Sequence, residues 1–159
     1  MRKDEILQVI QDFPGINFNE IARRTDLSNG VVSHYLLQLL EGGEIIKSEV
    51  GRAKYFHHQI PKKDIKFIMI FRNNTNYEIT KFLLGIDFPV TAEGITKAIK
   101  KSRSTVSVNM KKLEKMQLIG RKILKQKTKL TSDIGFYLLD EEFVKTILLK
   151  YNLNVRNEP

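Results

Sequence analysis

Cysteine and tryptophan are absent from the sequence, and proline occurs only four times among its 159 residues. Without cysteine the chain cannot form disulfides, use a thiol in catalysis, or hold iron–sulfur clusters or cysteine-ligated zinc. Long apolar runs are also missing, because the longest one near the middle covers residues 67–71 and a membrane span needs about twenty residues. The N-terminus turns acidic at Asp4 and Glu5, which predicts no secretion signal. We therefore expect a soluble, cytoplasmic protein that has no membrane as a partner.

Acidic residues are scarce relative to basic ones: 18 Asp and Glu stand against 27 Lys and Arg, a formal net charge of +9. Residues 1–72 carry 11 basic and 9 acidic side chains (+2), whereas residues 73–159 carry 16 and 9 (+7). Within residues 97–129, twelve basic residues are opposed only by Glu114. Such a surplus costs self-repulsion, and an anionic polymer would relieve it and release counterions. Because these residues do not form one basic amphipathic helix, nucleic acid fits better than a membrane surface.

The two halves of the chain share a pattern when the sequence is shifted by 74 residues. Ser28 then coincides with Ser102, Leu39 with Leu113 and Ile45 with Ile119. Identity is low, but these positions define a fold: a serine that opens a helix, a later core leucine and the first residue of a strand. An internal repeat of this kind predicts two copies of one structural unit.

Each repeat is predicted to contain three helices followed by a two-stranded hairpin. In the first repeat the helices are expected over 3–12, 18–25 and from Ser28 to Gly42, and the strands over 45–50 and 54–58. In the second, the helices are expected over 77–84, 92–100 and from Ser102 to Met116, and the strands over 119–124 and 135–139. Asn17 and Glu20 have the spacing of a capping box. A Lys-rich loop is expected over 125–133, and Asp140 is expected to cap a last helix.

The order of helix, tight turn, helix and hairpin is that of a winged helix-turn-helix. Residues 28–36 (SNGVVSHYL) and, more closely, residues 102–107 (SRSTVS) resemble the recognition helices of MarR-like and ArsR-like regulators. Residues 51–56 (GRAKYF) resemble the wing of archaeal single-chain regulators with tandem winged helices, and residues 71–79 (FRNNTNYEI) resemble the ArsR-type entry into the domain. The resemblance covers nearly the whole chain. It implies a sequence-specific transcription regulator that binds double-stranded DNA and has no enzymatic activity.

The expected fold class is therefore mainly α with small β-hairpins (α+β), with two winged helix-turn-helix domains in tandem. The expected organisation is a first domain over 1–60, an apolar and helical linker over 61–73, a second domain over 74–139, a C-terminal helix over 140–153 and a tail over 154–159. One departure from the family is Thr96, which stands where a small residue is expected. A second is the lack of cysteine or clustered histidine, which argues against ArsR-type metal sensing.

In this fold the N-terminal turn of the third helix enters the major groove, and the wing contacts phosphate or the minor groove. Arg pairs bidentately with guanine and Asn with adenine, which makes Arg103 and Asn29 the best base readers. Ser28 has a second interpretation, since capping alone explains a serine at that place. The candidate DNA-binding residues are Ser28, Asn29, Ser33, His34, Arg52, Lys54, Arg103, Ser104, Ser107, Lys111, Lys125, Lys127 and Lys129.

The sequence predicts no catalytic residue, cofactor or metal. His57 and His58 are adjacent in a strand and should point to opposite faces, so they should not share an ion. Glycine-rich phosphate loops, nucleophile elbows and paired catalytic carboxylates are missing.

Other partners stay open at this stage. Tandem winged helices also serve as protein-interaction adaptors in the basal transcription machinery and in chromosome segregation, and one repeat could bind protein. The sequence shows no exposed aromatic platform on which RNA bases could stack, which argues against RNA as the partner.

The apolar side chains of residues 65–71 and of the last helix exceed what two small domains need, which predicts a homodimer. Leu37 and Tyr35 form an apolar face that either reads thymine methyls or packs on something else, and we favour packing because Leu40 extends it.

Overall fold

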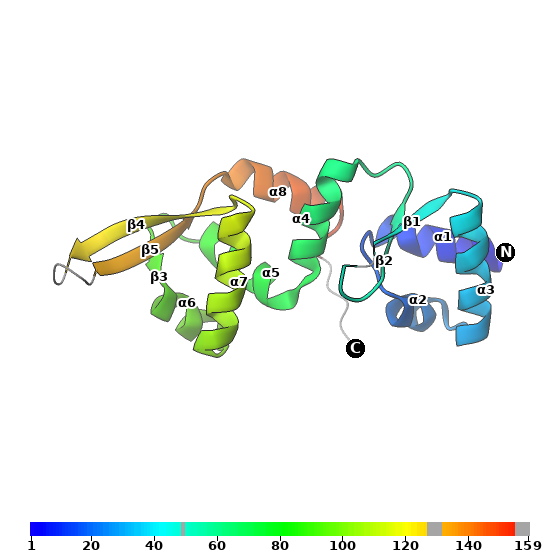
Figure 1. Cartoon of the computed structure of the whole chain (residues 1–159), viewed down its shortest axis with the longest axis horizontal. Coiled ribbons are helices and arrows are strands. Elements are labelled where there is room, and N and C mark those ends of the chain that lie inside the picture. Colours follow the sequence, from blue (N-terminus) through cyan, green and yellow to red (C-terminus); the bar gives the residue numbers. More distant parts are fainter. Residues whose placement is uncertain (49, 127–131, 155–159) are drawn as a thin grey trace. The chain divides into compact units, whose positions relative to one another are not determined.

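The computed structural model describes residues 1–48, 50–126 and 132–154, and the chain divides into two compact units (Figure 1). The first unit combines Met1–Met69 with Ile147–Pro159, and the second comprises Ile70–Thr146. Within the described residues, the fold is α+β, with helices and two small antiparallel sheets. No helix in these ranges has the length and hydropathy of a membrane span.

The first unit has the winged helix-turn-helix order of elements. Its N-terminal part consists of α1 (Arg2–Asp12), α2 (Phe18–Thr25), α3 (Asn29–Glu41), β1 (Ile45–Ser48) and β2 (Lys54–His57). The hairpin is antiparallel, with Ile45 opposite His57 and Ser48 opposite Lys54. Apolar residues at helical spacing face a common core whose fully buried members are Ile6, Ile10, Ile16, Ile21, Val32 and Leu39. This hydrophobic burial explains why three short helices are stable together.

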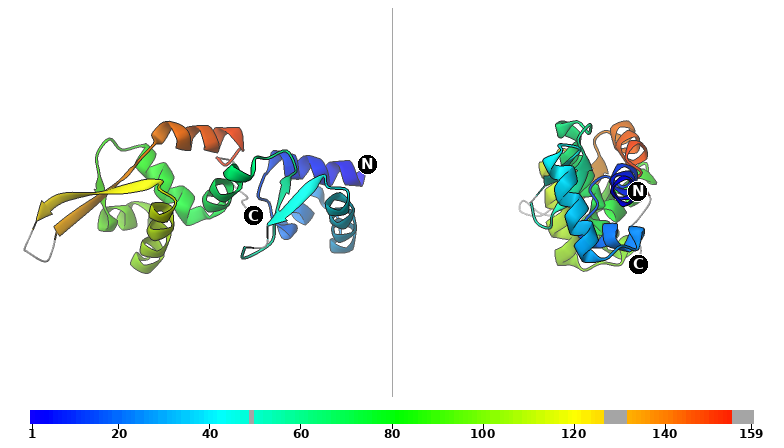
Figure 2. Two further views of the ribbon diagram at one scale, coloured as in Figure 1. Left: turned by 45° about the horizontal axis from the view of Figure 1, so that its top comes forward. Right: turned by 90° about the vertical axis from the view of Figure 1, so that its right-hand side faces the viewer.

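The second unit repeats this order and adds a strand. It contains α5 (Asn74–Leu84), β3 (Val90–Thr91), α6 (Ala92–Ile99), α7 (Arg103–Lys115), β4 (Ile119–Gln126) and β5 (Ser132–Leu138). Its antiparallel sheet has the order β3-β5-β4. The β4–β5 hairpin projects beyond the helices of its own unit (Figure 2). The core contains Ile79, Ile95, Val106, Leu113 and Phe136.

Polar caps and left-handed residues fix the turns at equivalent places in both units. The Ser28 Oγ accepts the backbone N–H of Val31 at 3.4 Å, and the Ser102 Oγ accepts that of Thr105 at 3.2 Å. The turn before each of these helices contains a non-glycine residue with positive φ, Asp26 at 53° and Lys100 at 56°. These two residues are 74 positions apart, so the repeat found in the sequence extends to the backbone conformation.

Most predicted elements differ from the structure by at most two residues at an end, and three differences are larger. Helix α5 begins three residues before the expected Tyr77, because the Asn73 Oδ1 accepts the N–H of Asn76 at 3.0 Å and starts the helix there. Strand β3 was not expected at all. The expected loop over 125–133 is partly strand, since Lys125 lies opposite Asp133 across a bulge after Ile123. Cross-strand pairing thus extends the hairpin into a segment whose lysines suggested a loop.

The apolar segment before α5 is helical, as expected: α4 spans Lys62–Arg72 and buries Ile68 and Phe71 completely. The last helix, α8 (Glu141–Lys150), begins where Asp140 accepts the N–H of Phe143 at 3.0 Å. Most of the apolar surface on which the homodimer prediction rests is thus already buried within one chain, including Val144, Ile147, Leu148 and Tyr151.

Residues from the C-terminal part complete the first unit. The Tyr151 hydroxyl donates a hydrogen bond to the buried Asp64 carboxylate, and the Lys150 Nζ lies 3.7 Å from the same carboxylate. Asn152 donates to the backbone oxygen of Asp12, and Leu153 is fully buried. Residues distant in sequence therefore form one packed body with α1 and α4.

Candidate nucleic-acid interface

Helices α6 and α7 of the second unit form a helix-turn-helix in which α7 occupies the place of a recognition helix. Arg103 is the first residue of α7, directly after the capping serine. Arg103, Ser104, Ser107 and Lys111 are all exposed. Arg103 has no ion-pair partner in the described part of the chain. Its guanidinium is therefore exposed to solvent at the N-terminus of α7.

The structure brings three of the predicted residues to one groove. A groove of about 290 Å³ lies among α6, α7 and the sheet, and its lining includes Arg103, Ser107 and Lys111. Arg121 of β4 and Glu114 of α7 also line it. The groove carries three cations and one carboxylate, which suits a polyanion.

Seven of the ten described basic residues within 97–125 make no ion pair in the ranges that the structure covers. Lys97 lies 3.2 Å from Glu93, and Lys101 lies 3.9 Å from Glu78. Arg121 is bound to Glu114. The cations left without an acid are Lys100, Arg103, Lys111, Lys112, Lys115, Lys122 and Lys125. Most of the described positive charge of this segment is thus not neutralised by ion pairs among the residues that the structure describes.

Arg121 is a residue that the sequence analysis did not single out. Its Nε and Nη2 donate to the two oxygens of Glu114 at 2.6 and 2.9 Å, and the guanidinium lies 5.5 Å from the Phe136 ring centroid. The hydrogen bonds to Glu114 raise the pKa of Arg121. The sequence signal for this pair is Glu114, because a single acid within a basic segment is expected to pair with one of the surrounding cations.

The second wing carries Lys125 on strand β4, where its side chain is exposed. Lys127 and Lys129 lie outside the described residues. In the first unit, Arg52 is exposed and follows Gly51, whose φ of 77° favours glycine at this turn. Lys54 is half-buried at the start of β2, so it offers less of its charge to solvent than Lys125.

The equivalent helix of the first unit, α3, is different in character. It contains neither lysine nor arginine, and Ser28 caps it. Asn29, Ser33 and His34 are exposed, and the His34 Nε2 lies 3.0 Å from the Gln38 Nε2. Leu37 is 56% exposed, so its side chain is not buried by the described part of the chain. This helix can make hydrogen bonds and apolar contacts but offers no cation to phosphate.

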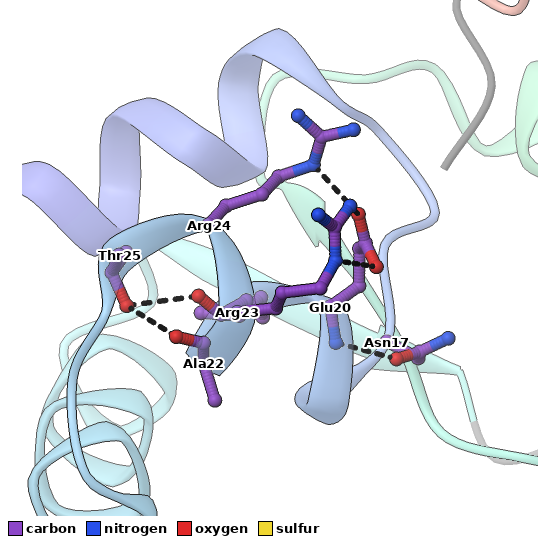
Figure 3. Close-up of polar contacts among 7 residues, drawn as sticks. Asn17, Glu20, Ala22, Arg23, Arg24 and Thr25 are labelled. Carbon is purple, nitrogen blue, oxygen red and sulfur yellow. Dashed lines mark hydrogen bonds and ion pairs between the residues drawn. The ribbon is translucent and has the colours of Figure 1, made fainter. Parts of the chain in front are cut away.

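Both arginines of α2 pair with the same acid, Glu20 (Figure 3). The carboxylate of Glu20 pairs with Arg23 and, at 2.9 Å, with the Arg24 Nε. The Arg24 guanidinium also stacks 3.7 Å from the centroid of Phe13. The Asn17 Oδ1 accepts the N–H of Glu20 at 2.9 Å, which confirms the predicted cap. The hydrogen bond to Glu20 raises the pKa of Arg23.

The prediction for the paired histidines was wrong in its geometry. The ring centroids of His57 and His58 are 4.5 Å apart, because β2 ends at His57 and strand alternation no longer applies beyond it. Burial and the neighbouring His58 lower the pKa of His57, against a smaller opposing effect of Glu44. Among the residues that the structure describes, no three of His, Cys, Asp and Glu are placed to hold a metal ion.

Comparison with known proteins finds one family model that matches the N-terminal part of the chain. Residues 1–66 match a family described as an N-terminal HTH domain, which supports a helix-turn-helix protein with a DNA-binding role. No curated protein matches the chain. A solved structure from Corynebacterium diphtheriae is 13% identical, with a TM-score of 0.32 over 87% of this chain, which spans only 26% of that protein. A conserved hypothetical protein from Chlorobium tepidum is 10% identical, with a TM-score of 0.34 over 94% of this chain and 97% of its own.

Proposed function

We propose that the chain is a sequence-specific, double-stranded-DNA-binding transcription regulator with two winged helix-turn-helix modules in tandem, of the MarR/ArsR-like archaeal type. The first module is α1 to β2 and the second is α5 to β5, joined by α4. The observation that carries the proposal is the set of unpaired cations around α7 and β4, with Arg103 at the first turn of α7. Their charge lies where this fold would meet phosphates, and Arg103 lies where it would meet a base edge.

The different charges of the two modules imply different contributions to DNA binding. The second module supplies most of the affinity, because neutralising phosphates and releasing counterions dominates binding to duplex DNA. The first module contributes hydrogen-bonding side chains, Asn29 and His34, with less charge, and so contributes to sequence preference.

Selection of ligands for the full chain from a pool of random duplexes tests the proposal. We expect one enriched motif that is bound at least a thousandfold more tightly than random duplex at physiological salt. Binding without an enriched motif would overturn sequence-specific regulation, and failure to bind any duplex would overturn the DNA-binding function.

One observation favours a second function for the first module. Helix α3 lacks cations and exposes Leu37, which suits an apolar protein partner such as a component of the basal transcription machinery. Leu37→Ser separates the alternatives. Unchanged affinity for the selected duplex supports a protein-facing α3, whereas a loss confined to sites with a thymine at one position supports a methyl contact.

We further infer a homodimer, now through exposed apolar residues, because those of α4 and α8 are mostly buried. Ile123 and Leu139 of the second unit are at least half exposed, and burial of exposed apolar side chains favours protein–protein association. Sedimentation at micromolar concentration should show twice the chain mass of 18.5 kDa. A single species at 18.5 kDa would contradict this expectation.

A further inference from the structure

Glu114 is the one acidic residue within the basic segment 97–129, and it lies in the groove where DNA is proposed to bind. Its side chain is 22% exposed, and it receives both guanidinium hydrogen bonds of Arg121. An acid in this place opposes polyanion binding. A carboxylate at this position therefore needs an explanation other than solubility.

The ion pair joins the two parts of the second module that would contact DNA. Glu114 belongs to the last turn of α7, and Arg121 belongs to β4, the first strand of the wing. A bidentate Arg–carboxylate pair fixes orientation as well as distance, and the Phe136 ring lies beside the same guanidinium. The pair thus holds the base of the wing against the recognition helix.

The first module cannot form the same acid–arginine pair at the equivalent positions. The positions 74 residues earlier are Leu40 and Lys47, and Leu40 packs against the core of its unit. An acid–arginine pair at these two equivalent positions is therefore found in the second module and not in the first.

We infer that Glu114 is a specificity-determining residue: it withholds the Arg121 charge from phosphates and sets the angle of the second wing relative to α7. This inference rests on the proposed function and concerns the same site. Without Glu114, Arg121 becomes one more mobile cation beside the groove and strengthens binding to any duplex. Base readout gains nothing from that charge, so the preference for the correct sequence falls.

The test compares Glu114→Gln with two controls on the selected duplex and on a random duplex, each over a range of salt. Glu114→Gln should raise affinity for random duplex by up to about eightfold at 0.1 M salt and steepen the slope of log K against log salt by up to about 0.9, the value of one phosphate contact. Affinity for the selected duplex should rise less, so that the ratio of the two affinities falls severalfold. Glu114→Asp keeps the charge and should restore the wild-type salt slope.

Glu93→Gln is the matched control, because it removes an equal charge from an ion pair that lies within α6. If Glu114→Gln changes both affinities by the same factor as Glu93→Gln, the inference is wrong while the DNA-binding function stands. If the wild-type chain binds no duplex, the proposed function fails first. Hydrogen exchange of the β4 amides without DNA is an independent measurement, and it should be faster in Glu114→Gln; unchanged exchange would overturn the role of the pair in orienting the wing.

Discussion

Arg103 is the residue on which base recognition should depend most. It is exposed at the start of α7, where a guanidinium can pair bidentately with guanine. Arg103→Ala should cost about 1–3 kcal/mol on the selected site and relax the preference at one base pair. The measurement is a competition assay with duplexes substituted at each position.

Lys112→Ala is the control for Arg103→Ala, because Lys112 is an exposed cation on the same helix and is not among the residues that line the groove. We expect it to weaken all duplexes slightly and equally. Equal losses on specific and random DNA in Arg103→Ala would reduce Arg103 to a phosphate contact.

Tyr151 links pH to the stability of the first unit. Burial and the hydrogen bond to Asp64 raise the pKa of Tyr151 above its ordinary value of 10.0. A group whose folded-state pKa is raised contributes stability that is fully present below its unfolded pKa and is lost as the pH rises above it. The free energy of unfolding should therefore fall as the pH rises beyond about 10.

Tyr151→Phe isolates this contribution. It deprives the buried Asp64 of a donor, which should cost about 1–3 kcal/mol at neutral pH. Chemical denaturation at pH 7 to 11 should then show a smaller alkaline decline than in the wild type. The same decline in both proteins would assign it to lysines instead.

At the scale of elements, the two wings should differ in their salt dependence. Lys125→Ala, Lys127→Ala and Lys129→Ala combined should lower the slope of log K against log salt by up to about 3, and Arg52→Ala with Lys54→Ala by at most about 2. The half-burial of Lys54 favours a smaller effect of the first wing. Titrations of both variants on one duplex decide the ranking, and a larger change from the first wing would reverse it.

Most helices could be predicted from the sequence because their signals are local. Apolar spacing and a capping side chain gave α2 its exact limits, Phe18–Thr25, with Asn17 as the cap. Strand β3 could not be predicted in this way. Two residues carry no periodicity, and Val90 and Thr91 are in a strand only because β5 lies beside them.

In the candidate site, too, features set by local sequence could be predicted and features set by tertiary contacts could not. The exposure of Arg103, Ser107 and Lys111 follows from their helical positions, and all three do line one groove. The Arg121–Glu114 pair depends on how β4 returns past α7, which no local pattern specifies. The closeness of His57 and His58 likewise depends on where β2 ends.

At the scale of the whole molecule, the order of the chain has a consequence for its synthesis. The second unit is one continuous segment, Ile70–Thr146, whereas the first unit needs residues on both sides of it. Domains fold as they leave the ribosome, usually the N-terminal one first. Here the Asp64 carboxylate has no hydrogen bond from Tyr151 until that residue has been synthesised, 87 residues later. Of the two units, the one that begins earlier in this chain is therefore completed last, because a chain that ends before residue 147 contains the whole second unit but lacks the C-terminal residues of the first.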